Sequence, residues 1–241
     1  MILAIDAGNS RIKWGLANEG GWQRLGAILT REVGQLDVAL ADLMPPEMVV
    51  ISNVAGASVG SLLAQVVSRF AVPVIWTKAC EQQCGISSSY ALPMQLGSDR
   101  WASLIGAWNF YHSACVVVNA GTTMTVDALT SEGIFLGGVI VPGLDLMSRC
   151  LEQGAAQLQQ QPGAFRYFPD NTADAMFSGA INASVGAIER MRDYLEKAVL
   201  QLPIIVLSGG AASILSPELK GGVECVDYLV LEGLLVIARQ G

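Results

Sequence analysis

Apolar residues in this chain gather in short runs that alternate with segments of helical periodicity. The short runs predict strands at residues 1–5, 11–16, 48–52, 72–76, 115–118, 124–129, 134–141 and 204–207. Apolar positions three or four residues apart predict helices at residues 60–70, 101–111, 181–199 and 229–239. Because strands and helices alternate, we expect an α/β protein with mixed sheets.

The opening of the chain recurs near its middle. Asp6-Ala-Gly-Asn-Ser follows the first strand, and Asn119-Ala-Gly-Thr-Thr follows another strand 113 residues later. The copies align in order, with Gly8, Asn9 and Ser10 matching Gly121, Thr122 and Thr123. A period of nearly half the chain predicts two domains of like design, residues 1–113 and 114–241, because solenoid repeats are only about 20–50 residues long.

Composition agrees with a compact fold and excludes several classes of protein. The 241 residues carry a formal charge of −7 at pH 7, and 52% of them are hydrophobic. This balance excludes a disordered chain and leaves little basic surface for nucleic acid. Mean hydropathy is +0.45, but no apolar stretch approaches the roughly 18 residues of a membrane span. The start of the chain lacks a signal-peptide pattern, so we expect a cytoplasmic protein without membrane partners.

Few residues are candidates for metal or nucleophile chemistry. His112 is the single histidine, and the five cysteines contain no CxxC pair, so a zinc site is not credible. A carboxylate is the better candidate for a general base. Residues 153–163 include several glutamines and are expected to form a polar connection or an exposed helix end.

The two recurring loops have the chemistry of phosphate-binding turns. A glycine between two strands lets the backbone approach a ligand, and exposed N–H groups with nearby amide and hydroxyl side chains can hold phosphate oxygens. Asp6 could hold Mg²⁺ through water, and Lys13 could meet a phosphate as a point charge. Each loop alone could be an ordinary hairpin turn. The matched pair favours phosphate binding, with the loops facing each other across a cleft.

Two further segments have both a functional and a purely structural interpretation. Ser208-Gly-Gly follows a predicted strand, where glycines permit close approach of a nucleotide or simply start a helix. Gly97-Ser-Asp-Arg precedes a predicted helix, where Asp99 would be either an N-cap or a base that takes a proton from a substrate hydroxyl. In the second case Arg100 would lie near an anionic group.

Six blocks occur in order over essentially the whole chain: DAGNSRIKW, GSDRWAS, NAGTTMTVD, GGVIVPGL, DNTADAMFSGA and SGGAA. Together they resemble the type III pantothenate kinases, a bacterial family related to a Bordetella virulence accessory factor. The resemblance implies two ribonuclease-H-like domains of the acetate and sugar kinase/Hsp70/actin superfamily, around a nucleotide cleft. It also implies a homodimer that phosphorylates pantothenate to 4′-phosphopantothenate with ATP and Mg²⁺, the first step of coenzyme A biosynthesis.

The resemblance assigns roles to individual residues. It implies an ATP phosphate loop at Asp6, Ala7, Gly8, Asn9, Ser10, Arg11, Ile12 and Lys13, with Thr122 as a second phosphate contact. Asp99 matches the catalytic base, which deprotonates the pantothenate hydroxyl. The implied pantothenate contacts are Tyr90, Gly97, Ser98, Asp99, Arg100 and Thr172, the last often supplied by the partner subunit.

The chain departs from the family pattern at two positions. Asn119 stands where the family commonly has an aspartate that binds potassium or ammonium. Asparagine keeps an oxygen ligand but loses the charge, so either cation affinity falls or the site works without the ion. Ser98 replaces a more usual alanine, a mild change.

Two alternatives to a pantothenate kinase follow from the same residues. One is a nucleotide-binding regulator with weak catalysis, although intact Asp6, Lys13 and Asp99 argue against it. The other is a kinase for a different hydroxyl acceptor, such as a sugar, because one fold hosts many chemistries.

Overall fold

The computed structural model describes residues 1–154 and 162–240, and the chain forms two compact units. Unit 1 contains Met1–His112 and Tyr228–Gly241, and unit 2 contains Ser113–Asp227. The chain therefore passes from unit 1 to unit 2 beside the expected boundary at residue 113. The C-terminal segment, expected in the second domain, packs in unit 1 instead. Most of the polar segment 153–163 lies outside the described residues.

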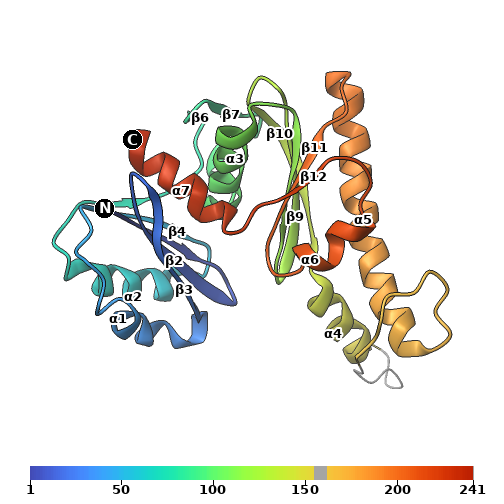
Figure 1. Ribbon diagram of the computed structural model, residues 1–241, viewed down its shortest axis with the longest axis horizontal. Coiled ribbons are helices and arrows are strands. Elements are labelled where there is room, and N and C mark those ends of the chain that lie inside the picture. Colours follow the sequence, from blue (N-terminus) through green and yellow to red (C-terminus); the bar gives the residue numbers. More distant parts are fainter. Residues whose placement is uncertain (155–161, 241) are drawn as a thin grey trace. The chain divides into compact units, whose positions relative to one another are not determined.

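Unit 1 is built on a five-stranded sheet with helices on both faces (Figure 1). The strands run in the order β3-β2-β1-β4-β5, with bounds β1 Ile2–Ala7, β2 Arg11–Asn18, β3 Gly21–Leu29, β4 Met48–Asn53 and β5 Val74–Trp76. The helices are α1 Leu36–Ala39, α2 Ala57–Ser68, α3 Ser98–Tyr111 and α7 Leu229–Gln240, with 3-10 turns at Thr30–Gln35 and Pro93–Gln95. Strands β6 Gln82–Gln83 and β7 Ile86–Ser88 form a short antiparallel hairpin.

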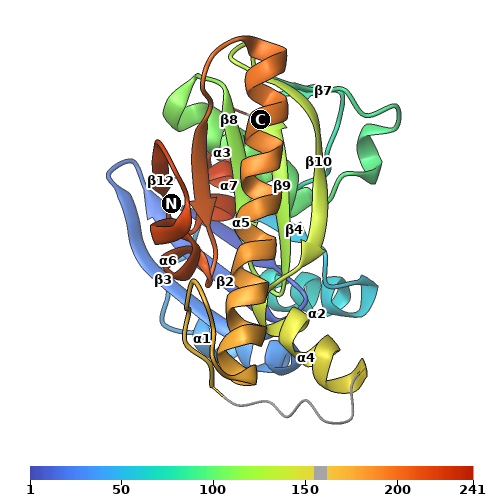
Figure 2. The same cartoon turned by 90° about the vertical axis from the view of Figure 1, so that its right-hand side faces the viewer.

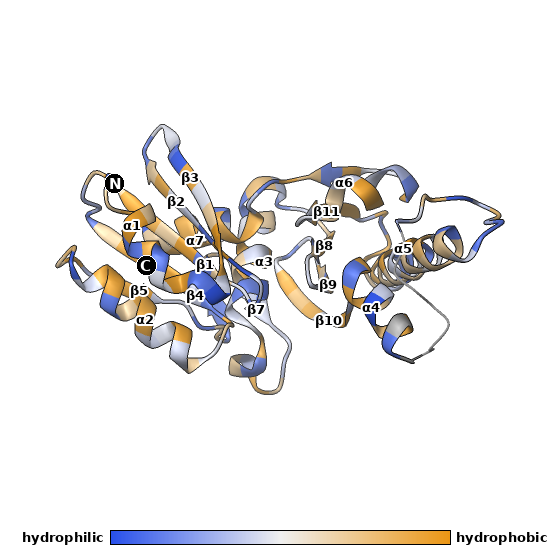
Figure 3. Cartoon of the chain, turned by 90° about the horizontal axis from the view of Figure 1, so that it is seen from below, coloured by the Kyte–Doolittle hydropathy of each residue, from blue (hydrophilic) through white to orange (hydrophobic). Residues whose placement is uncertain are grey.

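The two faces of this sheet have different roles. Leu3, Ile5 and Ile51 pack with Leu63 and Val67 of α2 in one fully apolar core. Figure 3 shows the matching alternation of hydrophobic and hydrophilic stretches along α2. The opposite face is covered by α7, which packs on β1, β2 and β4. Because side chains alternate along a strand, polar residues at the ends of β1 and β4 share the α7 face.

Unit 2 repeats this plan with different strands. Its strands run in the order β12-β11-β8-β9-β10, with bounds β8 Cys115–Ala120, β9 Thr123–Leu129, β10 Ile134–Pro142, β11 Ile204–Ser208 and β12 Val223–Cys225. The helices are α4 Leu144–Gly154, α5 Thr172–Val199 and α6 Ala212–Leu215, followed by a 3-10 turn at Ser216–Glu218. Helix α5 lies across β8 and β9 (Figure 2), where Ile181 and Ile188 enter a core with Val118 and Leu207.

The repeat seen in the sequence is a repeat of sheet topology. In each unit an antiparallel three-stranded meander is followed by two parallel strands added beside its first strand. The turns differ by one residue, since Ala7 pairs with Ile12 but Ala120 pairs with Met124. After the turn the structural match of Thr123 is therefore Arg11, not Ser10 as the sequence alignment predicts.

The hydrophobic pattern found the central strands and missed several peripheral elements. Strand β3 contains two glycines, Gly21 and Gly26, and two polar residues, Gln23 and Arg24, and it has no clear alternation of buried and exposed positions. Strand β12, the β6–β7 hairpin and α4 were also not predicted, and α5 begins at Thr172 rather than near residue 181. Edge strands and helix starts bury little apolar surface, so their sequences carry a weak periodic signal. No helix within the described part of the chain has the length and apolarity needed to cross a bilayer.

Helices α3 and α7 pack closely because each has a glycine at the contact, and a substitution there tests this packing in unit 1. A Cβ added to Gly233 would overlap the carbonyl oxygen of Ala102, and one added to Gly106 would lie 2.8 Å from the carbonyl oxygen of Leu229. We expect Gly233→Ala to lower the free energy of unfolding by about 3 kcal/mol, because backbone cannot move away as a side chain can. Gly179→Ala, in α5, is the control.

Nothing lies within 4 Å of a Cβ added to Gly179, so that variant should gain about 0.5–1 kcal/mol from helix propensity. Urea denaturation of both variants measures the difference. Equal stabilities would contradict the close helix contact.

Candidate active site

The β1–β2 turn presents an exposed, well-anchored backbone loop. The N–H of Gly8 donates to the carbonyl oxygen of Arg11 over 3.1 Å. Thr30 holds the turn from outside, with its hydroxyl donating to the Gly8 carbonyl over 2.7 Å and its N–H to the Ser10 carbonyl over 3.1 Å. Asn9, Ser10 and Arg11 are exposed. The turn thus has the fixed geometry that a phosphate-binding loop requires.

Not every residue of the predicted phosphate loop can reach a ligand with its side chain. Ala7 and Ile12 are fully buried in the core of unit 1. Their side chains support the turn from below. The groups available to a ligand are therefore the backbone of the turn, the exposed side chains at positions 9–11, and the neighbouring charged residues.

Asp6 is a buried carboxylate at the end of β1. It is 8% exposed, and its Oδ1 atom has no hydrogen-bond partner among the described residues. In the sheet it lies opposite Lys13 of β2 and Ser52 of β4. Burial, together with the charge of Asp99, raises the pKa of Asp6 from 3.8 to about 7, although the charge of Lys13 opposes the shift. An unpartnered buried carboxylate is costly for the fold and indicates that a cation belongs beside it.

The start of α3 brings a second carboxylate into the same region of unit 1. The hydroxyls of Ser52 and Ser98 are hydrogen-bonded at 2.8 Å, which fixes the helix start against β4. Asp99 accepts a hydrogen bond from the N–H of Arg100 at 2.8 Å. Burial raises the pKa of Asp99, and the backbone N–H of Arg100 opposes that shift. The N-cap is Gly97 and not Asp99, so the purely structural interpretation of Asp99 as a cap does not hold.

Gly97 is required by its position next to Asp99. A Cβ at this residue would lie 2.5 Å from Oδ1 of Asp99, so only glycine leaves the carboxylate in place. Arg100 is 6% exposed and engaged in interactions of its own. Tyr90 is half-buried after the β6–β7 hairpin, and its N–H donates to the Ser88 hydroxyl over 3.3 Å.

Unit 2 carries a corresponding row of polar side chains. Asn119 of β8 lies opposite Thr125 of β9 and Ser208 of β11, as Asp6 lies opposite Lys13 and Ser52 in unit 1. Thr125 is 6% exposed, and its hydroxyl oxygen has no hydrogen-bond partner among the described residues. The row therefore offers oxygen ligands but no carboxylate from these three residues.

The loop after β8 packs against glycines at positions where a side chain would overlap neighbouring backbone atoms. The N–H of Gly121 donates to the carbonyl oxygen of Thr123 over 3.2 Å, and Thr122 is exposed. Gly143 donates to the Thr122 carbonyl over 2.9 Å, and a Cβ there would overlap the Gly121 carbonyl oxygen. Gly209, with φ +103, would place a Cβ 2.5 Å from the carbonyl oxygen of Ala120. At Ser208-Gly-Gly the chain therefore passes close to the backbone at Ala120, and the N-cap of the following helix is Ala211.

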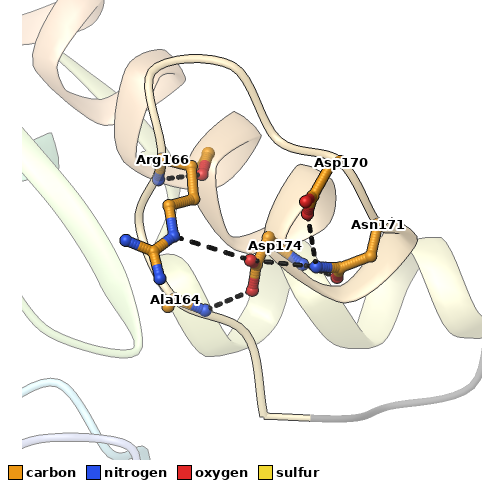
Figure 4. Close-up of polar contacts among 6 residues, drawn as sticks. Ala164, Arg166, Asp170, Asn171 and Asp174 are labelled. Carbon is orange, nitrogen blue, oxygen red and sulfur yellow. Dashed lines mark hydrogen bonds and ion pairs between the residues drawn. The ribbon is translucent and has the colours of Figure 1, made fainter.

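Thr172 is the first residue of α5. Figure 4 shows the polar contacts among neighbouring residues at the start of this helix. Asn171 is the N-cap and accepts from the Asp174 N–H at 2.9 Å, so Thr172 itself is not the cap. Asp174 in turn accepts from the Ala164 N–H at 2.7 Å and lies 3.9 Å from Arg166. The Ala164 N–H and the Asn171 side-chain amide, which donates to Asp174 Oδ2 over 3.0 Å, lower the pKa of Asp174. Thr172 is exposed at the end of this fixed helix start.

Ser52, Thr30 and Gly143 support these sites and were not among the predicted residues. One sequence signal identifies Ser52 in retrospect. Four buried apolar strands each carry a polar residue at or next to the carboxyl end, and these residues are paired within each sheet: Asp6 with Ser52, and Asn119 with Ser208. No cluster of three or more His, Cys, Asp or Glu suited to a metal occurs in the described residues. Mg²⁺ needs no such cluster, because one or two carboxylates and substrate phosphates commonly hold it. Asp6 fits that requirement.

Solved structures show which known proteins share this fold. A Baf-family protein from Campylobacter jejuni has a TM-score of 0.67 at 20% identity and covers 98% of this chain and 97% of its own. A glucokinase from an Antarctic psychrotroph has a TM-score of 0.51 at 10% identity and covers 99% of this chain and 98% of its own. The chain shares the fold of these two proteins.

Sequence relatives identify the family. Residues 2–193 match the family model described as type III pantothenate kinase. A protein of that name from Nitrosospira multiformis is 46% identical over 240 residues, which cover 100% of this chain and 92% of the relative. Another, from Nitrosomonas eutropha, is 44% identical over 246 residues, covering 100% of this chain and 95% of the relative. The chain belongs to the type III pantothenate kinase family.

Proposed function

We propose that this protein phosphorylates pantothenate to 4′-phosphopantothenate with ATP, the first step of coenzyme A biosynthesis. Membership of the type III pantothenate kinase family carries this proposal. The chemistry of unit 1 supports it, since a buried carboxylate, Asp6, and a half-buried one, Asp99, interact beside a fixed glycine turn. Phosphoryl transfer asks a protein mainly to position groups and offset charge, and one base is enough for the acceptor hydroxyl.

Asp99 is the base in this proposal. Its carboxylate takes the proton from the pantothenate hydroxyl as the hydroxyl oxygen forms a bond to the γ-phosphorus. The bond from that phosphorus to the bridging oxygen breaks, and ADP leaves with the electron pair. The Arg100 N–H, 2.8 Å from Asp99 Oδ1, holds the carboxylate in one orientation.

The backbone of residues 7–12 and the side chains of Asn9, Ser10 and Lys13 hold ATP phosphates in this proposal. Thr122, exposed on the corresponding loop of unit 2, adds a second phosphate contact. Asp6 holds Mg²⁺ through water, and the ion offsets charge on the phosphates when bound. Its unpartnered Oδ1 atom supports this role.

Gly97, Ser98 and Arg100 surround pantothenate, together with Tyr90 and the exposed Thr172. In the family resemblance the threonine comes from a partner subunit, so we propose a homodimer in the cytoplasm. Exposed apolar side chains such as Ile140 and Leu200, 61% and 90% exposed, would gain from burial in such an assembly.

A monovalent cation at Asn119 is a separate part of the proposal, because this chain has asparagine where the family commonly has aspartate. Asn119, Thr125 and Ser208 supply oxygen atoms, and the Thr125 hydroxyl is unpartnered. We propose weak potassium or ammonium binding there, because the site lacks the aspartate charge. No observation favours a regulator without catalysis or a sugar acceptor.

The experiment that tests the function is ADP release by the purified protein with MgATP and pantothenate, in sodium, potassium or ammonium salts. Turnover that requires pantothenate, with at most modest stimulation by potassium or ammonium, is the expected result. ATP binding without turnover in any salt would favour the regulator. Turnover with a sugar but not with pantothenate would establish the other acceptor.

A further inference from the structure

Tyr228 has a backbone conformation that its place in the fold does not explain. Its φ is 58°, in the left-handed region, which is an outlier for a bulky side chain. His112 and Leu200 are also left-handed, but they are the C-caps of α3 and α5, where this conformation is ordinary. Tyr228 instead precedes α7, where an N-cap is normally extended. A strained residue of this kind points to a function for its side chain.

The backbone that carries Tyr228 is fixed at the start of α7. Its carbonyl oxygen accepts from the N–H of Glu232 over 3.1 Å, which forms the first turn of the helix. The next residue, Leu229, is fully buried, and its carbonyl oxygen lies where a Cβ on Gly106 of α3 would come within 2.8 Å. The ring of Tyr228 therefore projects from a helix start that packs closely against a second helix.

This ring lies over the ammonium group of Lys13. The Nζ atom of Lys13 is 5.9 Å from the ring centroid, and both side chains are half-buried. A cation within about 6 Å of an aromatic face is attracted by the quadrupole of the ring, more strongly where water is partly excluded. Within residues 1–154 and 162–240 no carboxylate forms a salt bridge with Lys13. The ring, and not an ion pair, therefore holds the ammonium group.

The contact lies at the proposed phosphate site of unit 1. Lys13 of β2 lies opposite Asp6 of β1 in the antiparallel sheet, so both side chains share one face, which α7 covers. The charge of Lys13 lowers the pKa of Asp6, so the two groups interact electrostatically. A lysine is a point charge on a flexible stem, and holding it in place before a ligand arrives reduces the cost of ordering it on binding.

We propose that Tyr228 is a positioning residue, whose ring holds the Lys13 ammonium group in place for the phosphates of ATP. This inference rests on the proposed function, because Lys13 is a phosphate contact there. Loss of the ring should weaken binding of ATP through its phosphates. KM for pantothenate should not change, since neither Tyr228 nor Lys13 is among its proposed contacts.

Two substitutions at position 228 separate the aromatic ring from the rest of the side chain. Tyr228→Phe keeps the ring face and should bind MgATP as the wild type does. Tyr228→Leu keeps a bulky apolar residue but removes the ring, so the Kd for MgATP in titration calorimetry should rise about threefold to tenfold, the effect of ordering one free lysine side chain. Binding of adenosine, which has no phosphates, should be the same in both variants and shows that each is folded.

Tyr194→Leu is the matched control. Tyr194 of α5 also has a cation over its ring, with the guanidinium carbon of Arg190 4.8 Å from the ring centroid, and it has no proposed role at the phosphate loop. This variant should bind MgATP as tightly as the wild type. A loss of affinity equal to that of Tyr228→Leu would show that the effect is not specific to the Lys13 contact, and it would overturn the inference.

A double-mutant cycle with Lys13→Met tests the assigned partner. If Tyr228 acts through Lys13, Tyr228→Leu should weaken MgATP binding no further in the Lys13→Met protein. An equal loss in both backgrounds would show that Tyr228 acts independently of Lys13 and would contradict the proposal. So would an equal loss for adenosine, or a loss that Tyr228→Phe shares.

Because ATP binding and turnover are measured separately, failure of this inference is distinct from failure of the kinase proposal. If the protein binds MgATP without phosphorylating pantothenate, and Tyr228→Leu but not Tyr228→Phe weakens that binding, the positioning role stands and the kinase proposal falls. If it phosphorylates pantothenate, and the two variants bind MgATP equally well, the kinase stands and the positioning role is wrong. A protein that does not bind MgATP removes both.

Discussion

Asp99→Asn is expected to lower kcat for pantothenate phosphorylation about 1,000-fold, while ATP still binds. Asparagine keeps the size of the side chain and cannot accept the acceptor's proton, and general base catalysis commonly contributes about 10²–10⁴-fold. Burial raises the pKa of Asp99, so removing its charge should not destabilise the fold. Single-turnover kinetics and ATP titration on the same preparation measure the two effects separately.

Asp145→Asn is the matched control for this prediction. Asp145 lies in the first turn of α4, as Asp99 lies in the first turn of α3, but it is exposed and no resemblance assigns it a role. The control should retain full activity. Full activity of Asp99→Asn would show that this carboxylate is not the base, whatever the family relationship.

Asp6→Asn should abolish most activity and stabilise the metal-free protein at pH 8. The ionised carboxylate of Asp6 is buried without a hydrogen-bond partner at Oδ1, and burial raises its pKa from 3.8 to about 7. A raised folded-state pKa means that the folded protein holds the proton more tightly than the unfolded chain. The stabilisation is therefore complete below about pH 4 and is lost as the pH rises to about 7.

The size of this effect is on the order of 4 kcal/mol at most, from the shift in pKa. Urea denaturation in EDTA at pH 5 and pH 8 should show wild-type protein losing stability between the two values. Asp6→Asn should flatten that dependence, and Asp42→Asn, an exposed carboxylate, should leave it unchanged. A wild-type protein equally stable at both pH values would show that Asp6 ionises without cost.

Kinetics of Asp6→Asn test the metal role independently. If Asp6 holds Mg²⁺ through water, the variant should need more Mg²⁺ for half-maximal turnover as well as having a lower kcat. Because stability and activity change in opposite directions, unfolding cannot account for the loss. Unchanged activity would remove Asp6 from the phosphate machinery.

The central strands and the glycine turns of this protein could be predicted from sequence, because both depend on residues that are neighbours along the chain. Buried strands such as β1 and β8 are continuous apolar runs, and the turns that follow need glycine where backbone N–H groups face outward. The same local chemistry therefore appears in the sequence twice. Strand β3 could not be recognised in this way, because an edge strand buries only part of its surface and tolerates polar residues.

The sequence alone determined the central strands, the repeated glycine turns and the identity of Asp6 and Asp99 as candidate residues, because each depends on neighbours along the chain. Only the tertiary structure decided that the C-terminal helix packs in unit 1, where Gly233 meets Ala102. It also decided that the hydroxyls of Ser52 and Ser98 form a hydrogen bond and that the charge of Asp99 raises the pKa of Asp6. These contacts join residues far apart in sequence, and their energies come from burial and charge proximity, which no local pattern encodes.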